Sequence, residues 1–447
     1  MLRKIGLISL GCPKNLIDSE IMMGSLRDAG YELTAELEKA DAIIVNTCAF
    51  IGEAKEEAVM TILEAAKYKE QGNLKYLVVT GCLAERYKEE ILKEIPEVDL
   101  VVGTGSIGRI AEIINEAEAD KMQKVYADLP NSVEYLDSQR ILSDNKPYSY
   151  LKIAEGCSNH CTYCIIPSLR GPYRSRTIES IVNEAGKLAA AGKKEIVLVA
   201  QDVTRYGMDL YGEIKLVPLI RKLSEIEGIA RIRLLYCYPE RINDELIEEM
   251  SRNPRLCRYF DIPLQHVSDK ILKAMGRRGT KDYIINLLKK IRERIPGVAI
   301  RTTFIAGFPG ETEEDFNELY RFVEDHRFEH LGVFAYSREE GTPAYKMKGH
   351  LPKKVKEERR SRIMELQQRK IAQYNSSRIG QIYDTMIDGV AEDGIFYIGR
   401  SYAEAPEIDP VIYVSSAEPL EIGEVVPVKI LCADGYDLIG EVKFENI

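Results

Sequence analysis

The chain has 447 residues, of which 45% are hydrophobic and 30% are charged, and a net charge of −10. It is too long for one hydrophobic core, so we expect two to four domains. The sequence lacks the run of about 18 apolar residues that a membrane-spanning helix needs, and its first residues do not resemble a signal peptide. Nine cysteines without a dense disulfide pattern favour a cytoplasmic protein whose cysteines bind metal or are buried.

The first 142 residues alternate between short apolar runs and helical patterns, which predicts a doubly wound parallel sheet. The predicted strands are residues 5–10, 42–46, 76–80 and 100–102. The first three each end in a polar or glycine turn that contains one cysteine, namely Cys12, Cys48 and Cys82.

The carboxyl ends of parallel strands lie at the same edge of a sheet. Three cysteines at these ends can therefore lie close together although they are far apart in the sequence. In the flavodoxin-like strand order 2-1-3 the three strands are direct neighbours, about 4.8 Å apart. Their thiols would then converge on one crevice and could hold a metal cluster. The alternative is three ordinary core cysteines, since free cysteine is among the most buried residue types.

Residues 143–373 show a second alternation of strands and helices, with a linker expected at residues 143–147. Six strand candidates predict an open, incomplete relative of the eightfold β/α barrel. They are residues 150–154, 195–200, 231–236, 259–262, 299–305 and 331–334. A basic helix is expected over residues 346–370.

The sequence EGCSNHCTYCIIPSLRG places Cys157, Cys161 and Cys164 directly after the first of these strands. Closed zinc sites need four ligands, and no fourth cysteine lies nearby. Three thiolates on a four-iron cluster leave one iron open for a small molecule. The competing interpretation is a zinc knuckle that uses His160 as its fourth ligand.

Residues 374–447 contain five short strand candidates separated by Gly and Asp turns, which predicts a small β-barrel. They are residues 382–390, 395–400, 411–415, 425–431 and 438–444. From Gly380 onward the chain holds 14 acidic and 3 basic residues, a net charge of −11, so the rest is close to neutral. Cys237, Cys257 and Cys432 have no partner pattern, and we expect them in cores.

Six stretches of this sequence resemble the methylthiotransferase family of the radical S-adenosylmethionine superfamily, and in particular its RimO-type branch. They are SLGCPKNLIDSE (residues 9–20), GCSNHCTYCIIPSLRGPYRSR (156–176), AQDVTRYGMDLYG (200–212), DIPLQHVSDKILKAMGRRG (261–279), FIAGFPGETEEDF (304–316) and FAYSREEGTPA (334–344). The tRNA-modifying branch usually reads GCQMN at the first cysteine, where this chain has GCPKN.

The resemblance implies an N-terminal cluster domain, a radical S-adenosylmethionine barrel and a C-terminal TRAM barrel. It implies two 4Fe–4S clusters, one on Cys157, Cys161 and Cys164 and one on Cys12, Cys48 and Cys82. S-adenosylmethionine would be both radical source and methyl donor, a reaction that acid–base residues could not perform at an unactivated C–H bond. The implied reaction adds a methylthio group to the β-carbon of an aspartate of ribosomal protein S-twelve.

Strand ends of a β/α barrel carry the chemistry, which nominates further cofactor-binding residues. They are Gln201, Asp202, Arg174, Arg176, Gln265 and His266. A single histidine such as His266 is more often a structural hydrogen-bonding residue than a catalytic one. In the segment GFPGETEED we expect Thr312 to cap a helix, with Asp315 at the third position of that helix.

The charge of the C-terminal region distinguishes an RNA partner from a protein partner. An RNA-binding barrel should present a basic groove, whereas this tail is acidic and would attract a basic protein such as ribosomal protein S-twelve. We therefore expect no tRNA and no membrane partner, but an external electron donor. The alternatives are a tRNA adenosine methylthiotransferase and a non-catalytic iron–sulfur carrier; the carrier does not explain an open-iron loop on a β/α barrel.

Overall fold

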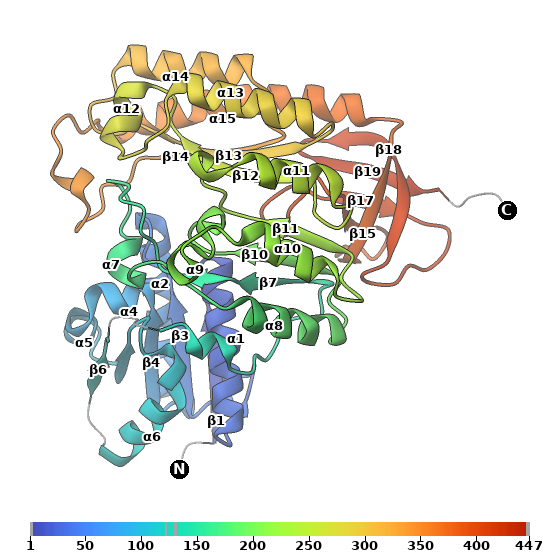
Figure 1. Cartoon of the computed structure of the whole chain (residues 1–447). Coiled ribbons are helices and arrows are strands. Elements are labelled where there is room, and N and C mark those ends of the chain that lie inside the picture. The colour runs from blue at the N-terminus through green and yellow to red at the C-terminus, as the bar shows by residue number, and fades with distance from the viewer. Residues whose placement is uncertain (1–2, 121–122, 129–131, 444–447) are drawn as a thin grey trace.

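The computed structural model describes residues 3–120, 123–128 and 132–443. An N-terminal α/β domain lies against a central β/α domain, and a small barrel stands beside the central domain at the C-terminal end (Figure 1). In the described part of the chain, no helix combines the length and the apolar character needed to span a membrane.

The N-terminal domain is a six-stranded parallel sheet in the order β2-β1-β3-β4-β5-β6. Its strands are β1 (Lys4–Ser9), β2 (Glu32–Leu33), β3 (Ala42–Thr47), β4 (Tyr76–Gly81), β5 (Leu100–Val102) and β6 (Lys124–Tyr126). The parallel sheet is confirmed, and the three strands that precede the cysteines are neighbours. Their expected order is corrected: β3 lies in the middle, because the two-residue strand β2, which the sequence pattern did not reveal, takes the edge position beside β1.

Helices cover both faces of this sheet, as a parallel sheet requires. They are α1 (Pro13–Asp28), α2 (Gly52–Ala66), α3 (Tyr68–Gln71), α4 (Cys82–Tyr87), α5 (Glu89–Glu94) and α6 (Ile110–Asp120). Successive residues of β3 point to opposite faces of the sheet and pack into two separate hydrophobic cores. Ile43 packs in one core with Ile62 of α2, and Ile44 packs in the other with Leu26 of α1.

The central domain holds two three-stranded parallel sheets, in the orders β11-β10-β7 and β12-β13-β14. The strands are β7 (Tyr148–Lys152), β10 (Glu195–Val199), β11 (Arg231–Leu234), β12 (Tyr259–Gln265), β13 (Ala299–Ala306) and β14 (His330–Ala335). A single bridge from Ile232 to Leu256 joins the halves, which fits the expected open six-unit barrel. β11 ends two residues earlier than expected because Tyr236 adopts a φ of 64°, which a strand cannot accommodate.

Long helices pack on the outside of these strands, and their apolar faces form one core. They are α8 (Ile178–Ala190), α10 (Leu216–Ser224), α11 (Asp244–Arg252), α13 (Lys281–Arg294), α14 (Glu313–Asp325) and α15 (Lys353–Arg378). Shorter elements are α7 (Ile166–Arg170), α9 (Met208–Tyr211), α12 (Asp269–Ala274) and the two-stranded antiparallel sheet of β8 (Ala154–Glu155) and β9 (Arg174–Ser175). The expected capping box of Thr312 and Asp315 opens α14.

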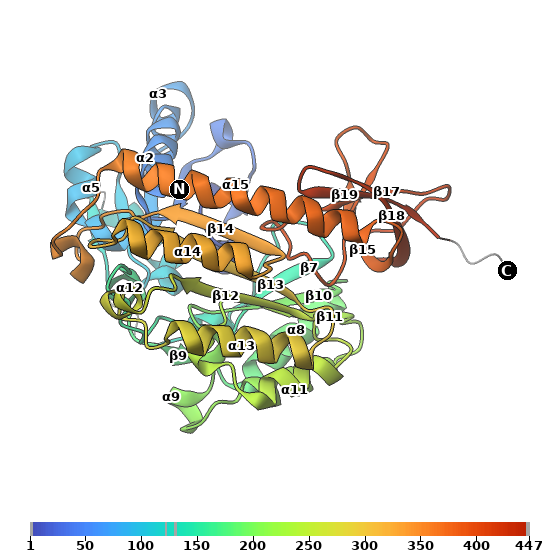
Figure 2. The same cartoon turned by 90° about the horizontal axis from the view of Figure 1, so that it is seen from above.

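The basic helix lies further along the chain than expected. It begins at Lys353, after Pro352 at its N-cap, and continues to Arg378. Gly349, with a φ of 82°, and Pro352 keep residues 347–352 out of the helix. Figure 2 shows α15 running from the side of the N-terminal domain to the C-terminal barrel. The proposed domain division at residue 374 therefore falls within its last turn.

The C-terminal domain is a closed barrel in the order β15-β16-β17-β19-β18. Its strands are β15 (Ile382–Val390), β16 (Tyr397–Arg400), β17 (Ile412–Ser415), β18 (Val425–Asp434) and β19 (Asp437–Val442). Five strands were expected; Phe444, the expected end of the last one, lies outside the described residues. Cys237 and Cys257 are buried as expected, but Cys432 is exposed on β18, so its core assignment was wrong.

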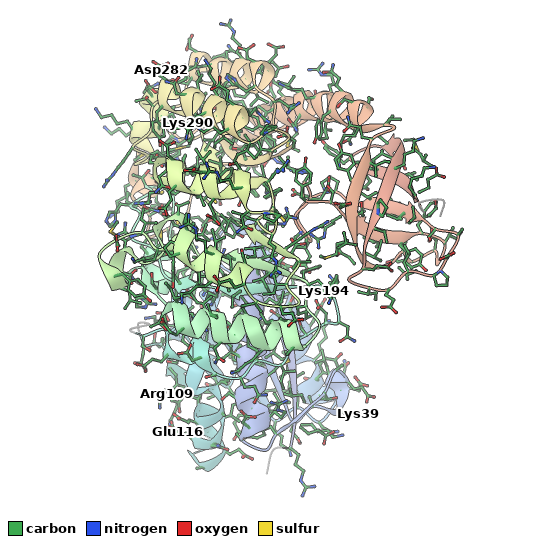
Figure 3. All side chains as sticks on the ribbon, turned by 45° about the vertical axis from the view of Figure 1, so that its right-hand side comes forward. Lys39, Arg109, Glu116, Lys194, Asp282 and Lys290 are labelled. Carbon is green, nitrogen blue, oxygen red and sulfur yellow. The ribbon has the colours of Figure 1, made fainter. Side chains whose placement is uncertain are left out.

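Buried ion pairs attach the barrel to the central domain. Glu195 of β10 accepts hydrogen bonds from Arg233 of β11 at 2.6 Å and from Arg400 of β16 at 3.1 Å. Arg378 at the end of α15 binds Glu404 of the barrel at 2.7 Å. Figure 3 labels Lys194 at the edge of the central domain that faces the barrel, where its side chain lies beside Gly423. Buried arginine–carboxylate pairs thus hold the barrel against the central domain, with the arginine on the barrel in one pair and on α15 in the other.

Candidate active site at the domain interface

Cys12, Cys48 and Cys82, here called the sheet triplet, lie where β1, β3 and β4 end. Cys12 is the N-cap of α1, and Cys82 is the first residue of α4. Glycine is required at the turn before Cys12: Gly11 has a φ of 89°, and a Cβ on it would lie 2.7 Å from the Cβ of Cys48. The turns therefore pack closely and bring the three cysteines to one edge of the sheet.

The electrostatics of the sheet triplet differ from residue to residue. Burial raises the pKa of the Cys12 thiol, but the positive charges of Lys14 and Arg170 outweigh it, so this pKa lies below its ordinary value. Burial raises the pKa of Cys48 to about 11, with further contributions from Cys82 and Cys12. The pKa of Cys82 is also raised by burial, against the charge of Arg170. The three thiols are close enough to affect one another.

Cys157, Cys161 and Cys164, here called the loop triplet, lie between β8 and α7. Burial raises the pKa of Cys164 to about 12, and the nearby charges of Cys161 and Cys157 add to this rise. The backbone N–H of Asn159 lies 3.4 Å from the sulfur of Cys157. The hydroxyl of Tyr238 lies 3.6 Å from the sulfur of Cys161. The loop triplet is thus a second compact group of thiols.

Neither triplet, as it lies in the described structure, surrounds a position for a single metal ion. Among the described residues, no three Cys, His, Asp or Glu side chains converge on a position that one metal ion could occupy. A four-iron cluster has no such requirement, because each thiolate binds a different iron. His160, the fourth ligand of the competing zinc interpretation, is solvent-exposed. The sheet triplet also has the positive charges of Lys14 and Arg170 beside it, which offset thiolate charge.

One buried arginine connects the surroundings of the two triplets. Arg170, at the end of α7, donates to Asp18 Oδ2 at 3.1 Å, to Glu155 Oε2 at 2.9 Å and to Asn15 Oδ1 at 2.6 Å. Asp18 and Asn15 belong to α1, which begins beside Cys12, whereas Glu155 directly precedes the loop triplet.

Glu155 carries this connection to the loop triplet itself. Its Oε1 accepts the backbone N–H of Gly156 at 3.0 Å, one residue before Cys157, and its Oε2 also binds Lys152 at 2.7 Å. Lys152 in turn binds Asp18. Two cations and two carboxylates are therefore buried together between the two domains. Sequence reasoning missed Arg170, although it lies within the quoted motif SLRGPYRSR.

Gln201 and Asp202, the first two nominated residues, lie beside the loop triplet. Gln201 donates to Glu155 Oε1 at 2.8 Å, and its own Oε1 is buried without a partner. Asp202 accepts from Asn159, inside the loop triplet, at 2.9 Å and from Arg241 at 2.7 Å. Gln201 thus offers a free acceptor there, whereas Asp202 orients the loop.

The nominated arginines differ from each other. Arg174 donates to the carbonyls of Pro172 and Arg170, and its Nε is buried without a partner. Arg176 is fully engaged with neighbouring residues, including Glu184 and Ser180. Arg174 therefore keeps one free donor, and Arg176 has the contacts of a structural residue.

The last nominated pair lies at the end of β12. Gln265 has a φ of 70°, an uncommon conformation for a residue with a side chain. His266 is fully buried; its Nδ1 accepts from the backbone of Ser268 at 3.0 Å, and its Nε2 lies 3.4 Å from Glu311. His266 Nε2 is buried without a hydrogen-bond partner, so His266, like Gln201, keeps one free polar atom, and its role stays a prediction.

Three family descriptions match consecutive parts of the chain. They are "Uncharacterized protein family UPF0004" at residues 4–103, the radical SAM superfamily at residues 151–323 and the TRAM domain at residues 379–442. Among solved structures, the radical S-adenosylmethionine methyltransferase TsrM from Kitasatospora setae has a TM-score of 0.56 at 15% identity, covering 77% of this chain and 74% of that one. At that identity the likeness establishes the fold alone.

Curated relatives match the chain along its whole length. A protein of Acetivibrio thermocellus named "Ribosomal protein uS12 methylthiotransferase RimO" is 56% identical over 100% of both chains. Proteins of the same name from Lachnoclostridium phytofermentans and Clostridioides difficile are 52% and 50% identical, over 98% and 99% of this chain and 99% of each relative. The chain therefore belongs to the methylthiotransferase family of radical S-adenosylmethionine enzymes.

Proposed function

We propose that this enzyme adds a methylthio group to the β-carbon of an aspartate of ribosomal protein S-twelve (uS12), in the cytoplasm. The observation that carries the proposal is that Arg170 and Glu155 connect the surroundings of the two cysteine triplets across one domain interface. The names of the full-length relatives support the choice of substrate. The tRNA reaction has no comparable support.

The loop triplet would hold a 4Fe–4S cluster with one iron free for S-adenosylmethionine, and the sheet triplet a second cluster. When bound, these groups supply an adenosyl radical that takes the hydrogen, the sulfur that replaces it, and a methyl group from a second S-adenosylmethionine; an external donor supplies electrons. Asn159 and Tyr238 contact the sulfurs of Cys157 and Cys161 and hold the loop in place. Gln201 and Arg174 offer the free acceptor and donor for the cofactor.

The acidic barrel would dock the basic ribosomal protein. Several of its carboxylates are already committed to arginines, among them Asp388, Glu404 and Asp409. Exposed acids remain on the barrel, most of them in its turns and loops. They are Glu392, Asp393, Glu418, Glu421, Glu424 and Asp434. Opposite charge on a docking surface mainly raises the association rate, so this contact should weaken with salt.

A charge-reversal variant tests the docking without disturbing the buried ion pairs. Changing Glu418, Glu421 and Glu424 to Lys should raise the KM for ribosomal protein S-twelve while leaving kcat, the iron content and uncoupled S-adenosylmethionine cleavage nearly unchanged. The matched control places three lysines on the exposed outer face of the central domain, at Glu245, Glu248 and Asp282. Equal KM values for both variants, or modification of a tRNA stem-loop in preference to the protein, would contradict the proposal.

A further inference from the structure

Lys14 is a buried ammonium group with no carboxylate partner among the described residues. Its side chain belongs to a residue that is 8% exposed, and no described carboxylate lies within ion-pairing distance of it. The two other buried lysines of the described chain differ: Lys152 pairs with Asp18 and Glu155, and Lys193 binds the carboxylate and carbonyl of Asp144. Cys12 and Tyr236 lie beside it, but no described carboxylate does, so Lys14 is suited to a carboxylate supplied from outside the chain.

The position of Lys14 is fixed from both domains. It lies in the first turn of α1, two residues after Cys12, and its Nζ lies 3.5 Å from the ring centroid of Tyr236 in the central domain. Tyr236 is held by two backbone contacts: its N–H donates to Asp261 at 2.8 Å, and its carbonyl accepts from Val203 at 3.2 Å. The ring face of Tyr236 favours a cation but supplies no negative charge.

The loop that carries Tyr236 also reaches the loop triplet. Two residues further on, the hydroxyl of Tyr238 lies 3.6 Å from the sulfur of Cys161. Lys14 therefore lies on the side of the sheet triplet, in contact with a loop whose next tyrosine contacts the loop triplet. The ammonium group is thus placed at the boundary between the two sets of thiols.

Two other cations nearby, Arg170 and Arg241, already have carboxylate partners. Arg170 donates to Asp18, Glu155 and Asn15, and Arg241 pairs with Asp202 at 2.7 Å. Lys14 is the better choice for a new carboxylate because no described carboxylate forms an ion pair with it.

This inference rests on the proposed function. The carbon that loses hydrogen and gains sulfur must be reached from both triplets, and in an aspartate side chain the carboxylate is bonded directly to that carbon. When that carbon lies between the triplets, the carboxylate lies there too, and a cation at the boundary between the triplets can bind it. We propose that Lys14 binds the side-chain carboxylate of the substrate aspartate and thereby selects aspartate over asparagine.

The test uses the anaerobically reconstituted enzyme and two forms of ribosomal protein S-twelve, with Asp or Asn at the modified position. Binding is measured without reductant, so that no turnover occurs, and kcat/KM is measured with reductant. Lys14→Met should weaken binding of the Asp form by about 10- to 100-fold, the size of a charge-assisted hydrogen bond. It should leave the Asn form unchanged, so the preference for Asp disappears. Lys14→Arg should keep much of that preference.

Three measurements separate this role from others. The Lys14→Met enzyme should keep its iron content, the reduction potential of the loop-triplet cluster and its uncoupled production of 5′-deoxyadenosine. Lys193→Met, which removes another buried lysine, should leave the preference for Asp intact. A Lys14→Met enzyme that still prefers Asp, or that loses iron or shifts a cluster potential without losing the preference, overturns the proposal, because the lysine would then serve the Cys12 thiolate. If the unaltered enzyme modifies neither form of ribosomal protein S-twelve, the result contradicts the proposed function itself and, with it, the role of Lys14.

Discussion

Replacing Arg170 by Met should destabilise the interface between the N-terminal and central domains, so that the first unfolding transition occurs at a lower denaturant concentration than in the unaltered protein. Arg170 is 2% exposed and donates hydrogen bonds to three buried acceptors across the interface. Methionine keeps most of the apolar volume but leaves Asp18 and Glu155 with only Lys152 to neutralise them. Breaking a buried ion pair by removing one partner costs about 3–5 kcal/mol, which lowers the folding equilibrium constant by roughly a hundred- to several-thousand-fold.

Urea unfolding followed by tyrosine circular dichroism measures this loss, since the chain has 25 Tyr and no Trp. Arg221→Met is the matched control: Arg221 also lies on a helix and pairs with Glu249 at 2.8 Å, but its side chain is 57% exposed. An exposed pair of this kind contributes below about 1 kcal/mol. If both variants lose the same stability in the first unfolding transition, the buried network does not hold the two domains together.

The remaining predictions concern the triplets and the barrel. Changing Cys157, Cys161 and Cys164 together to Ala should leave about half of the roughly eight irons that two clusters require and abolish S-adenosylmethionine cleavage; tight zinc with no visible absorption would contradict this. Changing Cys12, Cys48 and Cys82 to Ala should preserve 5′-deoxyadenosine production and eliminate the methylthiolated product; full modification by this variant would make them ordinary core cysteines. Burial raises the pKa values of Glu195 and Glu404, but their arginine partners outweigh it and hold both at about 2. Because these pKa values lie below the unfolded value of about 4.3, the ion pairs stabilise barrel docking above that pH. That stability should be lost as the pH falls from about 4.3 towards 2, seen as proteolytic cleavage near Arg378; a docking stability that does not change over this range would refute the assignment.

The sequence was sufficient for those features that repeat locally. Each strand of the N-terminal sheet is an apolar run closed by a turn, so the positions of Cys12, Cys48 and Cys82 at strand ends followed from the pattern. The five strands of the C-terminal barrel followed in the same way. The open barrel of six units followed from alternation, although the strand ends shifted where a residue such as Tyr236 adopts a positive φ.

Features that depend on distant contacts could not be predicted. Arg170 binds Asp18 and Asn15, which lie more than 150 residues earlier in the chain, so no local pattern marks it as an interface residue. Arg176, nominated from the same motif, instead binds Ser180 and Glu184 of the helix α8 that follows it. The two-residue strand β2 is too short for any periodicity, and it alone changed the expected strand order.

The central claim is that both triplets act on one aspartate of a ribosomal protein. The most direct test is the intact mass of ribosomal protein S-twelve after incubation with the anaerobically reconstituted enzyme, S-adenosylmethionine, a sulfide source and a reductant. The account predicts a gain equal to one methylthio group replacing one hydrogen, located by fragmentation at a single aspartate and absent with either triplet variant. An unmodified protein in a reaction that does produce 5′-deoxyadenosine, together with a methylthiolated tRNA in the parallel reaction, would contradict it.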